Sequence, residues 1–192
     1  MSDPISFLSS KSHINIEIKA KIADSEKIRN ILKSRKAEFK GIDKQTDTYF
    51  NVNYGRLKLR EGNIENNLIY YERENQKGPK QSDVLLYKTE SGSILKNILS
   101  KSLDVLVTVE KEREIYFINN VKFHIDSVKH LGSFVEIEAI GNPEIDKKVE
   151  LVKQCEFYMN LFDVRKENLI EVSYSDMLMK NGDNVKSNSQ KR

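Results

Sequence analysis

Charged side chains recur at every second residue in several segments that read as β-strands. In the first, Asn15, Glu17 and Lys19 alternate with isoleucine residues. Side chains of a strand point to opposite faces with a period of two, so these three polar residues share one face. The same alternation places charged pairs on later strands: Lys58 with Arg60, Lys111 with Arg113, and Glu136 with Glu138. Charges of both signs on several strand faces predict a sheet rolled around a polar interior that holds a polyanion and its metal ions.

These residue types suit a nucleoside triphosphate, which carries several negative charges and is usually bound with Mg²⁺. The candidate metal ligands are the carboxylates Glu17, Glu136 and Glu138. The candidate phosphate ligands are the cations Lys19, Arg60, Arg73, Lys111 and Arg113. Lys111 and Arg113 belong to a strand face that is otherwise apolar, where an unpaired cation is costly. We therefore expect a bound anion to compensate these two charges, although snorkelling at the rim of the sheet would also accommodate them.

Simpler interpretations remain open for each segment considered alone. Residues 17–19 are also typical of a solvent-exposed strand face with an ion pair, and residues 56–60 of a solvated sheet edge. His124 and Asp126 share a face and form a candidate metal pair or general base. Because metal-assisted phosphoryl chemistry needs little acid–base help from the protein, the sequence favours the carboxylate and cation sets over a catalytic histidine.

The composition is that of one globular domain. The 192 residues are 38% hydrophobic and 32% charged, and acids and bases are interspersed to a net charge of +3. This balance argues against a nucleic-acid surface, and no apolar run approaches the roughly 20 residues that span a bilayer. The N-terminus lacks a signal-peptide pattern and Cys155 is the single cysteine, so we expect a cytoplasmic protein. The domain is expected over residues 1–180, with a disordered tail at 181–192.

Hydrophobic periodicity and turn residues predict the elements that position these side chains. The expected order is a strand at 13–21, a helix capped by Asp24 that ends before Gly41, and strands at 45–53, 56–61 and 67–73. After an exposed loop at 74–82 the order repeats, with a strand at 83–88, a helix at 92–102, and strands at 105–117, 121–127 and 133–140. A long helix at 144–162 and a helical turn at 175–179 follow. Eight strands joined largely by hairpins predict an antiparallel sheet that either closes or leaves edges.

The residues on these strands resemble a known family. Asn15-Ile16-Glu17-Ile18-Lys19 is similar to the ExExK strand signature of the CYTH superfamily, which contains the class IV adenylyl cyclases and thiamine or inorganic triphosphatases. The likeness continues at residues 47–50, 57–61, 69–73, 109–113, 124–128 and 131–138, and spans about residues 13 to 178. The resemblance implies an α+β fold, in which an eight-stranded antiparallel closed barrel, the triphosphate tunnel, is flanked by helices.

The resemblance also implies roles for individual residues. Glu17 and Glu136 match metal ligands of the family, with Glu138 as a third, and the metal would be Mg²⁺ or Mn²⁺. The implied triphosphate contacts are Lys19, Arg60, Lys111 and Arg113, with Arg73 as a further candidate, and the implied catalytic residues are Glu17, Lys19 and Arg113. Asp126 matches an acidic position of the family, and Lys58 and Asn15 complete the candidate set. Asn15 departs from the signature, because its amide replaces the first glutamate and offers a metal a carbonyl oxygen but no charge.

Among the family's activities, the likeness favours adenylyl cyclase, because the 113–117 run and the 131–134 turn are closer to that branch. The expected reaction converts ATP to 3′,5′-cyclic AMP and pyrophosphate through in-line attack by the ribose 3′-hydroxyl. Two alternatives stay open: hydrolysis of a nucleoside, thiamine or inorganic triphosphate in the same site, and a weakly catalytic module that binds nucleotides or polyphosphates. The expected partner is an organic triphosphate, with ATP favoured. Nucleic acid and membrane are not expected as partners, and a homodimer is compatible with the fold.

Overall fold

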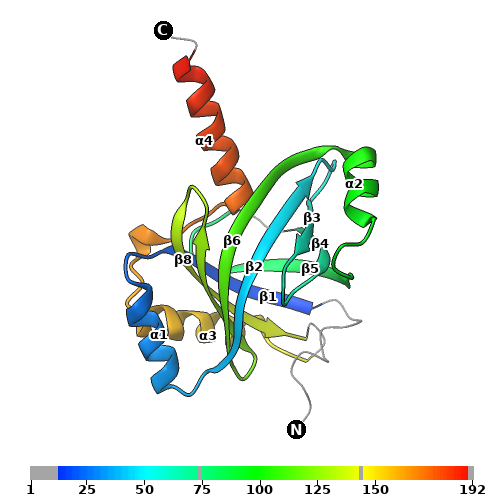
Figure 1. Ribbon diagram of the computed structural model, residues 1–192. Helices are drawn as coiled ribbons and strands as arrows, with labels where there is room; N and C mark the ends of the chain where they lie inside the picture. Colours follow the sequence, from blue (N-terminus) through cyan, green and yellow to red (C-terminus); the bar gives the residue numbers. More distant parts are fainter. Residues whose placement is uncertain (1–12, 73–74, 143–144, 190–192) are drawn as a thin grey trace.

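Eight antiparallel strands close into a ring in the computed structural model, which describes residues 13–72, 75–142 and 145–189 (Figure 1). The strands are β1 (His13–Lys21), β2 (Glu38–Phe50), β3 (Arg56–Glu61), β4 (Asn67–Glu72), β5 (Lys80–Lys88), β6 (Val105–Ile118), β7 (Val121–Val128) and β8 (Gly132–Gly141). Around the ring they follow the order β1-β5-β4-β3-β2-β6-β7-β8, and β8 pairs again with β1. Closure gives each strand a neighbour on both sides and removes the sheet edges. The predicted closed antiparallel barrel is thereby confirmed.

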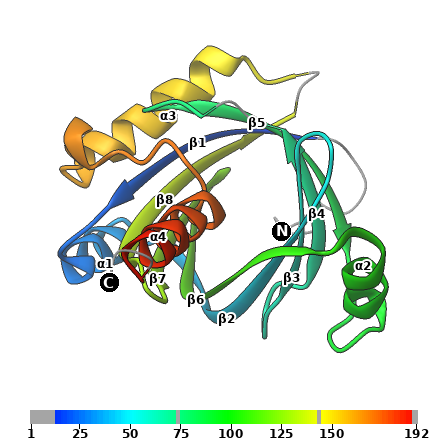
Figure 2. The same ribbon diagram turned by 90° about the horizontal axis from the view of Figure 1, so that it is seen from above.

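Within the described residues, the flanking α-helices are α1 (Ser25–Ser34), α2 (Leu95–Leu103), α3 (Lys148–Leu161) and α4 (Tyr174–Ser189). Viewed down the ring, α1 and α3 lie outside it on the side of β1 and β8, and α2 lies on another side near β3 and β4 (Figure 2). Helix α4 projects away from one end of the ring (Figure 1). Helix α1 begins as predicted, because the Asp24 carboxylate accepts hydrogen bonds from the backbone N–H groups of Glu26 and Lys27, at 3.0 and 3.1 Å.

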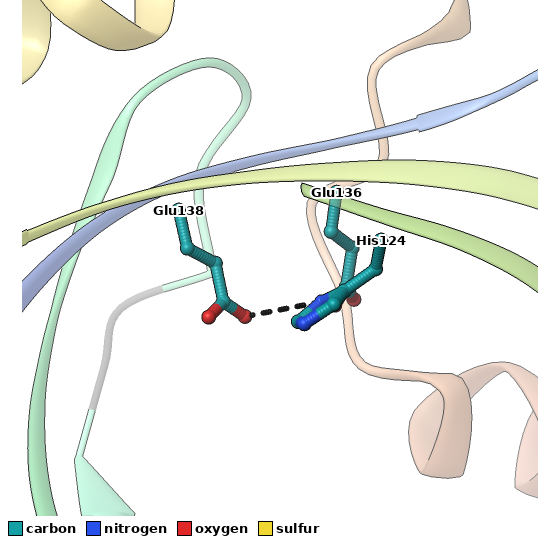
Figure 3. Close-up of side chains that lie close together, drawn as sticks. All are labelled: His124, Glu136 and Glu138. Atoms are coloured by element: carbon teal, nitrogen blue, oxygen red, sulfur yellow. Dashed lines mark hydrogen bonds and ion pairs between the residues drawn. The ribbon is translucent and has the colours of Figure 1, made fainter. Parts of the chain in front are cut away.

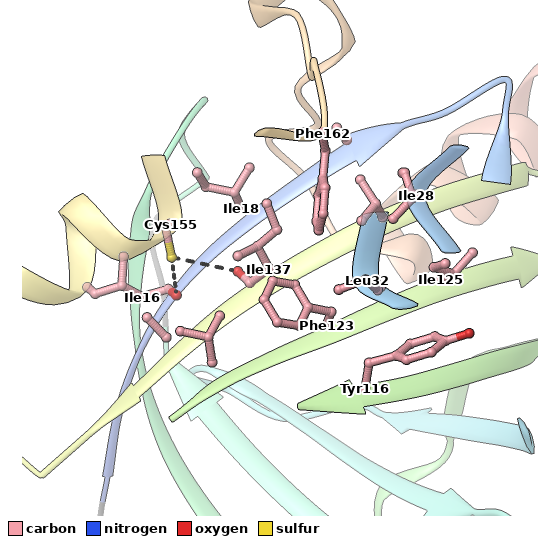
Figure 4. Packing of buried hydrophobic residues seen from close by; sticks show 14 of the residues in the cluster. Ile16, Ile18, Ile28, Leu32, Tyr116, Phe123, Ile125, Ile137, Cys155 and Phe162 are labelled. Atoms are coloured by element: carbon pink, nitrogen blue, oxygen red, sulfur yellow. Dashed lines mark hydrogen bonds between the residues drawn. The ribbon is translucent and has the colours of Figure 1, made fainter. Parts of the chain in front are cut away.

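The main hydrophobic core lies outside the ring, between the strands and helices α1 and α3 (Figure 4). Ile18, Phe123 and Ile137 point outward from three adjacent strands and belong to one buried cluster with Leu32 of α1 and Cys155 of α3. Because side chains alternate along a strand, the polar residues between these positions must point into the ring. The charged strand faces therefore line an enclosed interior and are not solvent-exposed faces.

The order of elements confirms the predicted repeat of strand, helix and three strands, first in β1 to β4 and again in β5 to β8. Strand β2 nevertheless starts at Glu38, well before the predicted position 45. Lys36 adopts a left-handed φ of 57° after α1, and the register of β2 with β6 shifts between Phe39 and Gly41. The strict alternation that identifies a strand is therefore missing from the first half of β2.

Strand β5 also starts early, so the predicted exposed loop at 74–82 is wrong for Lys80. This residue is 1% exposed, and its Nζ donates to the carbonyl oxygens of Ile170 and Glu171 at 3.2 and 3.0 Å. Pro79 directly precedes the strand, where its missing N–H disturbs no ladder. The proline therefore marks the entry into a strand. Arg73, a predicted phosphate ligand, lies outside the described residues.

The C-terminal elements differ from their predicted bounds. Helix α3 begins at Lys148, and residues 143–144, where the prediction placed its start, lie outside the described residues. Helix α4 extends to Ser189, so the described part of the expected tail at 181–192 is helical. A reciprocal cap begins this helix: the Asp176 N–H donates to the Ser173 hydroxyl at 3.1 Å, and the Ser173 N–H donates to the Asp176 carboxylate at 3.0 Å. Over the described ranges, no helix has both the length and the apolar character needed to cross a bilayer.

Candidate active site

The inward faces of the strands enclose a cavity of about 490 Å³, which falls within the range of roughly 300–1,000 Å³ that is usual for small-molecule sites. The predicted site residues that line it are Asn15, Glu17, Lys19, Lys58, Arg60, Lys111, Arg113, Glu136 and Glu138. Asp126 is buried directly against Arg113. Ring closure thus brings charged residues of β1, β3, β6 and β8 to one enclosed space.

Asp47, on β2, is the centre of one ion-pair cluster. Its carboxylate accepts hydrogen bonds from Lys58 Nζ at 2.9 Å, Lys111 Nζ at 2.8 Å and Arg60 Nε at 2.8 Å. The register pairs Asp47 with Arg60 on β3 and with Val109 on β6, so cations reach it from both neighbouring strands. Burial alone would raise the pKa of Asp47, but the three cations hold that pKa well below its usual range. Asp47 is therefore a fixed negative charge at neutral pH.

Arg113, on β6, lies between two buried carboxylates. Its Nε donates to Asp126 Oδ1 at 2.7 Å, and its Nη2 donates to Glu136 Oε2, also at 2.7 Å. Burial would lower the pKa of Arg113, but Asp126 and Glu136 keep it well above its usual value. The other oxygen of Glu136 lies 3.0 Å from Lys19 Nζ, and the Tyr174 hydroxyl donates to Asp126 Oδ2 at 2.9 Å. We call Lys19, Lys58, Arg60, Lys111 and Arg113, with their partners Asp47, Asp126 and Glu136, the charged belt.

The expectation that a bound anion must compensate Lys111 and Arg113 is wrong. Both cations have protein carboxylate partners, Asp47 for Lys111 and Asp126 for Arg113, and both acids are buried. These acids come from neighbouring strands, so only the strand register shows that they face the cations. An ammonium has three N–H donors and a guanidinium five, so pairing leaves donors for an incoming phosphate.

Three side chains of β7 and β8 are placed to hold a divalent cation (Figure 3). His124 pairs with Glu136 in the register, and its Nδ1 lies 3.1 Å from Glu136 Oε2 and 3.6 Å from Glu138 Oε1. Burial lowers the pKa of His124, and the neighbouring Arg113 adds to this effect, so its imidazole is neutral at pH 7. Neutral imidazole is the form that binds metals. This group replaces the pair of His124 with Asp126 that the sequence offered as an alternative.

Glu17 and Asn15, on β1, face the same cavity. Glu17 lies opposite Glu138 in the register, and its Oε1 is 3.9 Å from Lys80 Nζ. Asn15 Oδ1 is buried without a hydrogen-bond partner among the described residues. An orphaned carbonyl oxygen and several carboxylates in one cavity fit a bound divalent cation, for which oxygen atoms are ligands. Glu17 stays a predicted ligand beside the group of His124, Glu136 and Glu138.

Apolar side chains lie at both ends of the cavity, on either side of the charged belt. At the end next to α4, aromatic and aliphatic side chains pack together: Tyr49, Val109, Leu131, Phe134 and Tyr174. At the other end Ile115 and Phe117 follow Arg113 along β6, and Ile140 follows Glu138 along β8, so apolar side chains line the cavity there beside the charged residues Lys40, Lys88 and Lys122. We call the apolar lining residues Ile64, Leu86, Ile115, Phe117 and Ile140 the apolar chamber.

Sequence reasoning missed several residues of the cavity. Glu65, in the β3–β4 turn, accepts a hydrogen bond from Arg60 at 2.9 Å and pairs with Lys122 of β7. Lys122 shares a strand face with His124 and Asp126, so the alternation of β7 carried a signal for it. Glu65 lies in a turn without periodicity, and no sequence pattern marks it.

Comparison with known proteins gives the same fold. The model of the family described as the CYTH domain matches residues 13–174. A Methanocaldococcus jannaschii protein named "Putative adenylate cyclase" is 28% identical over 174 residues, which cover 85% of this chain and 98% of that protein.

Solved structures show the same architecture. A protein from Pyrococcus horikoshii OT3 matches with a TM-score of 0.72 and 25% identity, over 84% of this chain and 98% of that one. A Hippeastrum protein described as a "putative adenylyl cyclase" with a dominant triphosphatase activity matches with a TM-score of 0.56 and 11% identity, over 88% of this chain and 96% of that one. Because the family model covers most of the sequence and the ring is the expected one, the chain belongs to the CYTH family.

Proposed function

We propose that this protein is an adenylyl cyclase that converts ATP to 3′,5′-cyclic AMP and pyrophosphate inside the ring. The observation that carries the proposal is the order of surfaces along the cavity, in which the charged belt is followed by the apolar chamber. An inorganic triphosphate needs only the belt, whereas ATP adds a nucleoside whose base requires an apolar wall. The 28% identity to the Methanocaldococcus jannaschii protein named "Putative adenylate cyclase" supports the same activity.

The charged belt would hold the three phosphate groups. Arg60 and Arg113 would make forked contacts with phosphate oxygens, and Lys19 and Lys111 would add point charges. A triphosphate fixed in this way makes attack on the α-phosphorus an oriented intramolecular step. The bond from the ribose 3′-oxygen to phosphorus forms, the 3′-hydroxyl proton passes to water or to the leaving pyrophosphate, and the bond to the bridging oxygen of the β-phosphate breaks. The same cations would stabilise the charge of the leaving pyrophosphate.

A divalent metal fits the acidic side of this cavity. The carboxylates of Glu136 and Glu138 lie beside the His124 ring, and Glu17 faces them from β1. Mg²⁺ or Mn²⁺ bound there would polarise the α-phosphate and lower the pKa of the 3′-hydroxyl. The chain's own cations then position the substrate relative to these carboxylates.

Triphosphate affinity should fall as the pH rises above about 7. Burial lowers the pKa of Lys111 to about 7, and Arg60 and Arg113 contribute to the decrease, although Asp47 opposes it. A bound triphosphate favours the charged ammonium, so binding takes up a proton above pH 7 and weakens by up to about tenfold per pH unit. Calorimetric titration with ATP in buffers of different ionisation enthalpy measures this uptake. Lys111→Met should abolish the uptake, and an unchanged proton uptake in that variant would disprove the role of Lys111.

Hydrolysis of the triphosphate is the second candidate, because the charged belt alone suits a triphosphate. Product analysis by ³¹P NMR, with ATP and separately with inorganic triphosphate, separates the two activities. A cyclase releases one pyrophosphate and one cyclic AMP per ATP, and leaves inorganic triphosphate intact. Orthophosphate and ADP from ATP, or cleavage of inorganic triphosphate, would instead assign the protein as a hydrolase.

A further inference from the structure

The His124 ring lies in the wall of the cavity but has no role in the proposed binding of the phosphates. It is 1% exposed and lies beside Glu136 and Glu138 on the wall of the cavity (Figure 3). Its Nε2 has no hydrogen-bond partner among the described residues, and the same holds for Asn15 Oδ1 on the wall of the same cavity. Buried polar side-chain atoms are in the large majority hydrogen-bonded. The Asn15 oxygen therefore points to a group that binds at this wall, whereas a cation bound by His124 Nδ1 would leave the ring proton on Nε2.

The spacing of the donor atoms matches the edges of a metal coordination shell. Metal bonds of about 2.1 Å to nitrogen and oxygen place neighbouring ligand atoms about 3.0 Å apart in octahedral geometry and about 3.4 Å apart in tetrahedral geometry. His124 Nδ1 lies 3.1 Å from Glu136 Oε2 and 3.6 Å from Glu138 Oε1. One ligand atom from each of the three residues lies within 4.8 Å of the other two. Two of the three separations are thus close to the edges of a coordination shell, and the third residue pair lies near enough to share the same cation.

The carboxylates alone make a weak site for a cation. Both oxygens of Glu136 face cations, with Oε1 3.0 Å from Lys19 Nζ and Oε2 2.7 Å from Arg113 Nη2. Asn15 contributes a neutral amide to the same wall. A nitrogen ligand would therefore strengthen the binding of a cation. It would strengthen the binding of some divalent metals more than that of others. Imidazole suits divalent transition metals, whereas Mg²⁺ is bound by oxygen ligands and keeps much of its water.

We propose that His124 is a metal ligand together with Glu136 and Glu138, and that this site prefers a divalent transition metal, such as Mn²⁺, over Mg²⁺. The inference rests on the proposed function in one respect: the metal binds in the cavity in which ATP is proposed to react. It adds the identity of a ligand and the class of metal to that function.

Metal binding to the full-length protein without nucleotide tests this proposal. Titration with MnCl₂, followed by electron paramagnetic resonance and repeated in competition with MgCl₂, should give at least about tenfold tighter binding of Mn²⁺. Electron spin echo modulation of bound Mn²⁺ should show a directly coordinated ¹⁴N nucleus. His124→Asn should remove this modulation and weaken Mn²⁺ binding by about 10–100-fold, with Mg²⁺ binding changed by less than about twofold. The matched control is His130→Asn in the exposed β7–β8 turn, where φ is 68° and asparagine is tolerated, and it should leave both signals unchanged.

Bound Mn²⁺ without ¹⁴N modulation in the wild-type protein would overturn the proposal, as would modulation that persists in His124→Asn. The wild-type measurement needs no variant, so a folding defect cannot obscure it. A failure of the proposed cyclase activity can be distinguished from a failure of the proposed metal site. If Mn²⁺ binds with a coordinated nitrogen but ATP yields no cyclic AMP, the metal site stands and the proposed function fails. If ATP yields cyclic AMP but bound Mn²⁺ lacks a coordinated nitrogen, the function stands and the metal site fails.

Discussion

Replacing Arg113 with methionine should lower the unfolding free energy of the ligand-free protein by about 3–5 kcal/mol. Arg113 is 3% exposed, and its guanidinium compensates Asp126, which is fully buried, and Glu136. Methionine keeps the unbranched apolar stem of the side chain but leaves Asp126 as a buried charge without its cation. The loss of unfolding free energy relative to the wild type should be smaller at acidic pH, where Asp126 of the variant can take up a proton. Urea unfolding followed by circular dichroism measures the difference at each pH.

Two further variants test the cause of this loss. Arg165→Met removes an exposed guanidinium that is 3.6 Å from Glu167, and should change stability by no more than about 0.5 kcal/mol. Asp126→Asn in the Arg113→Met background removes the stranded charge and should recover part of the stability. An Arg113→Met variant that is as stable as the wild type would mean that the Arg113 ion pairs do not stabilise the fold.

Glu138→Gln should reduce the rate of cyclic AMP formation by about 10²–10³-fold and leave the fold intact. Glutamine preserves the shape of the side chain but removes the charge that a metal needs. Glu138 contacts the His124 ring at 3.6 Å, whereas Glu136 is tied to Lys19 and Arg113, so this variant separates the metal site from the ion-pair network. The rate is measured with saturating ATP and Mn²⁺, and the circular dichroism spectrum and unfolding midpoint check the fold.

The matched control for this change is Glu112→Gln on β6. Glu112 is exposed on the outer face of the ring, where it lies 3.6 Å from Lys44. Its substitution removes the same charge without reaching the cavity, so the rate should stay at the wild-type value. Equal rates for Glu138→Gln and Glu112→Gln would exclude Glu138 from the metal site.

The parts of the fold that could be predicted from the sequence are those in which alternation is strict. Strand β1 shows it plainly, because Ile16 and Ile18 meet the outer helices while Glu17 and Lys19 enter the ring. The Asp24 cap was predicted because a short polar side chain directly before an amphipathic segment is a local signal. The polar interior followed from the same alternation, repeated on several strands.

The partners inside the cavity could not be predicted, because they depend on strand register. Asp47 was visible as an acid on a strand, yet only its pairing with β3 and β6 brings it to Arg60 and Lys111. His124 likewise meets Glu136 through the β7–β8 register, which moves the candidate metal group away from Asp126. A shift of one residue would turn each of these side chains to the other face, so composition and spacing alone leave the ion pairs undetermined.

The position of a bound nucleotide tests most directly whether the ring holds ATP as proposed. In a crystal structure with Mn²⁺ and an ATP analogue that carries a methylene group between its α- and β-phosphorus atoms, the phosphates should contact Lys19, Arg60, Lys111 and Arg113 of the charged belt. The adenine should lie in the apolar chamber, against Phe117 and Ile140. An analogue bound outside the ring, or one with its base at Tyr174 beside α4, would contradict the proposed site.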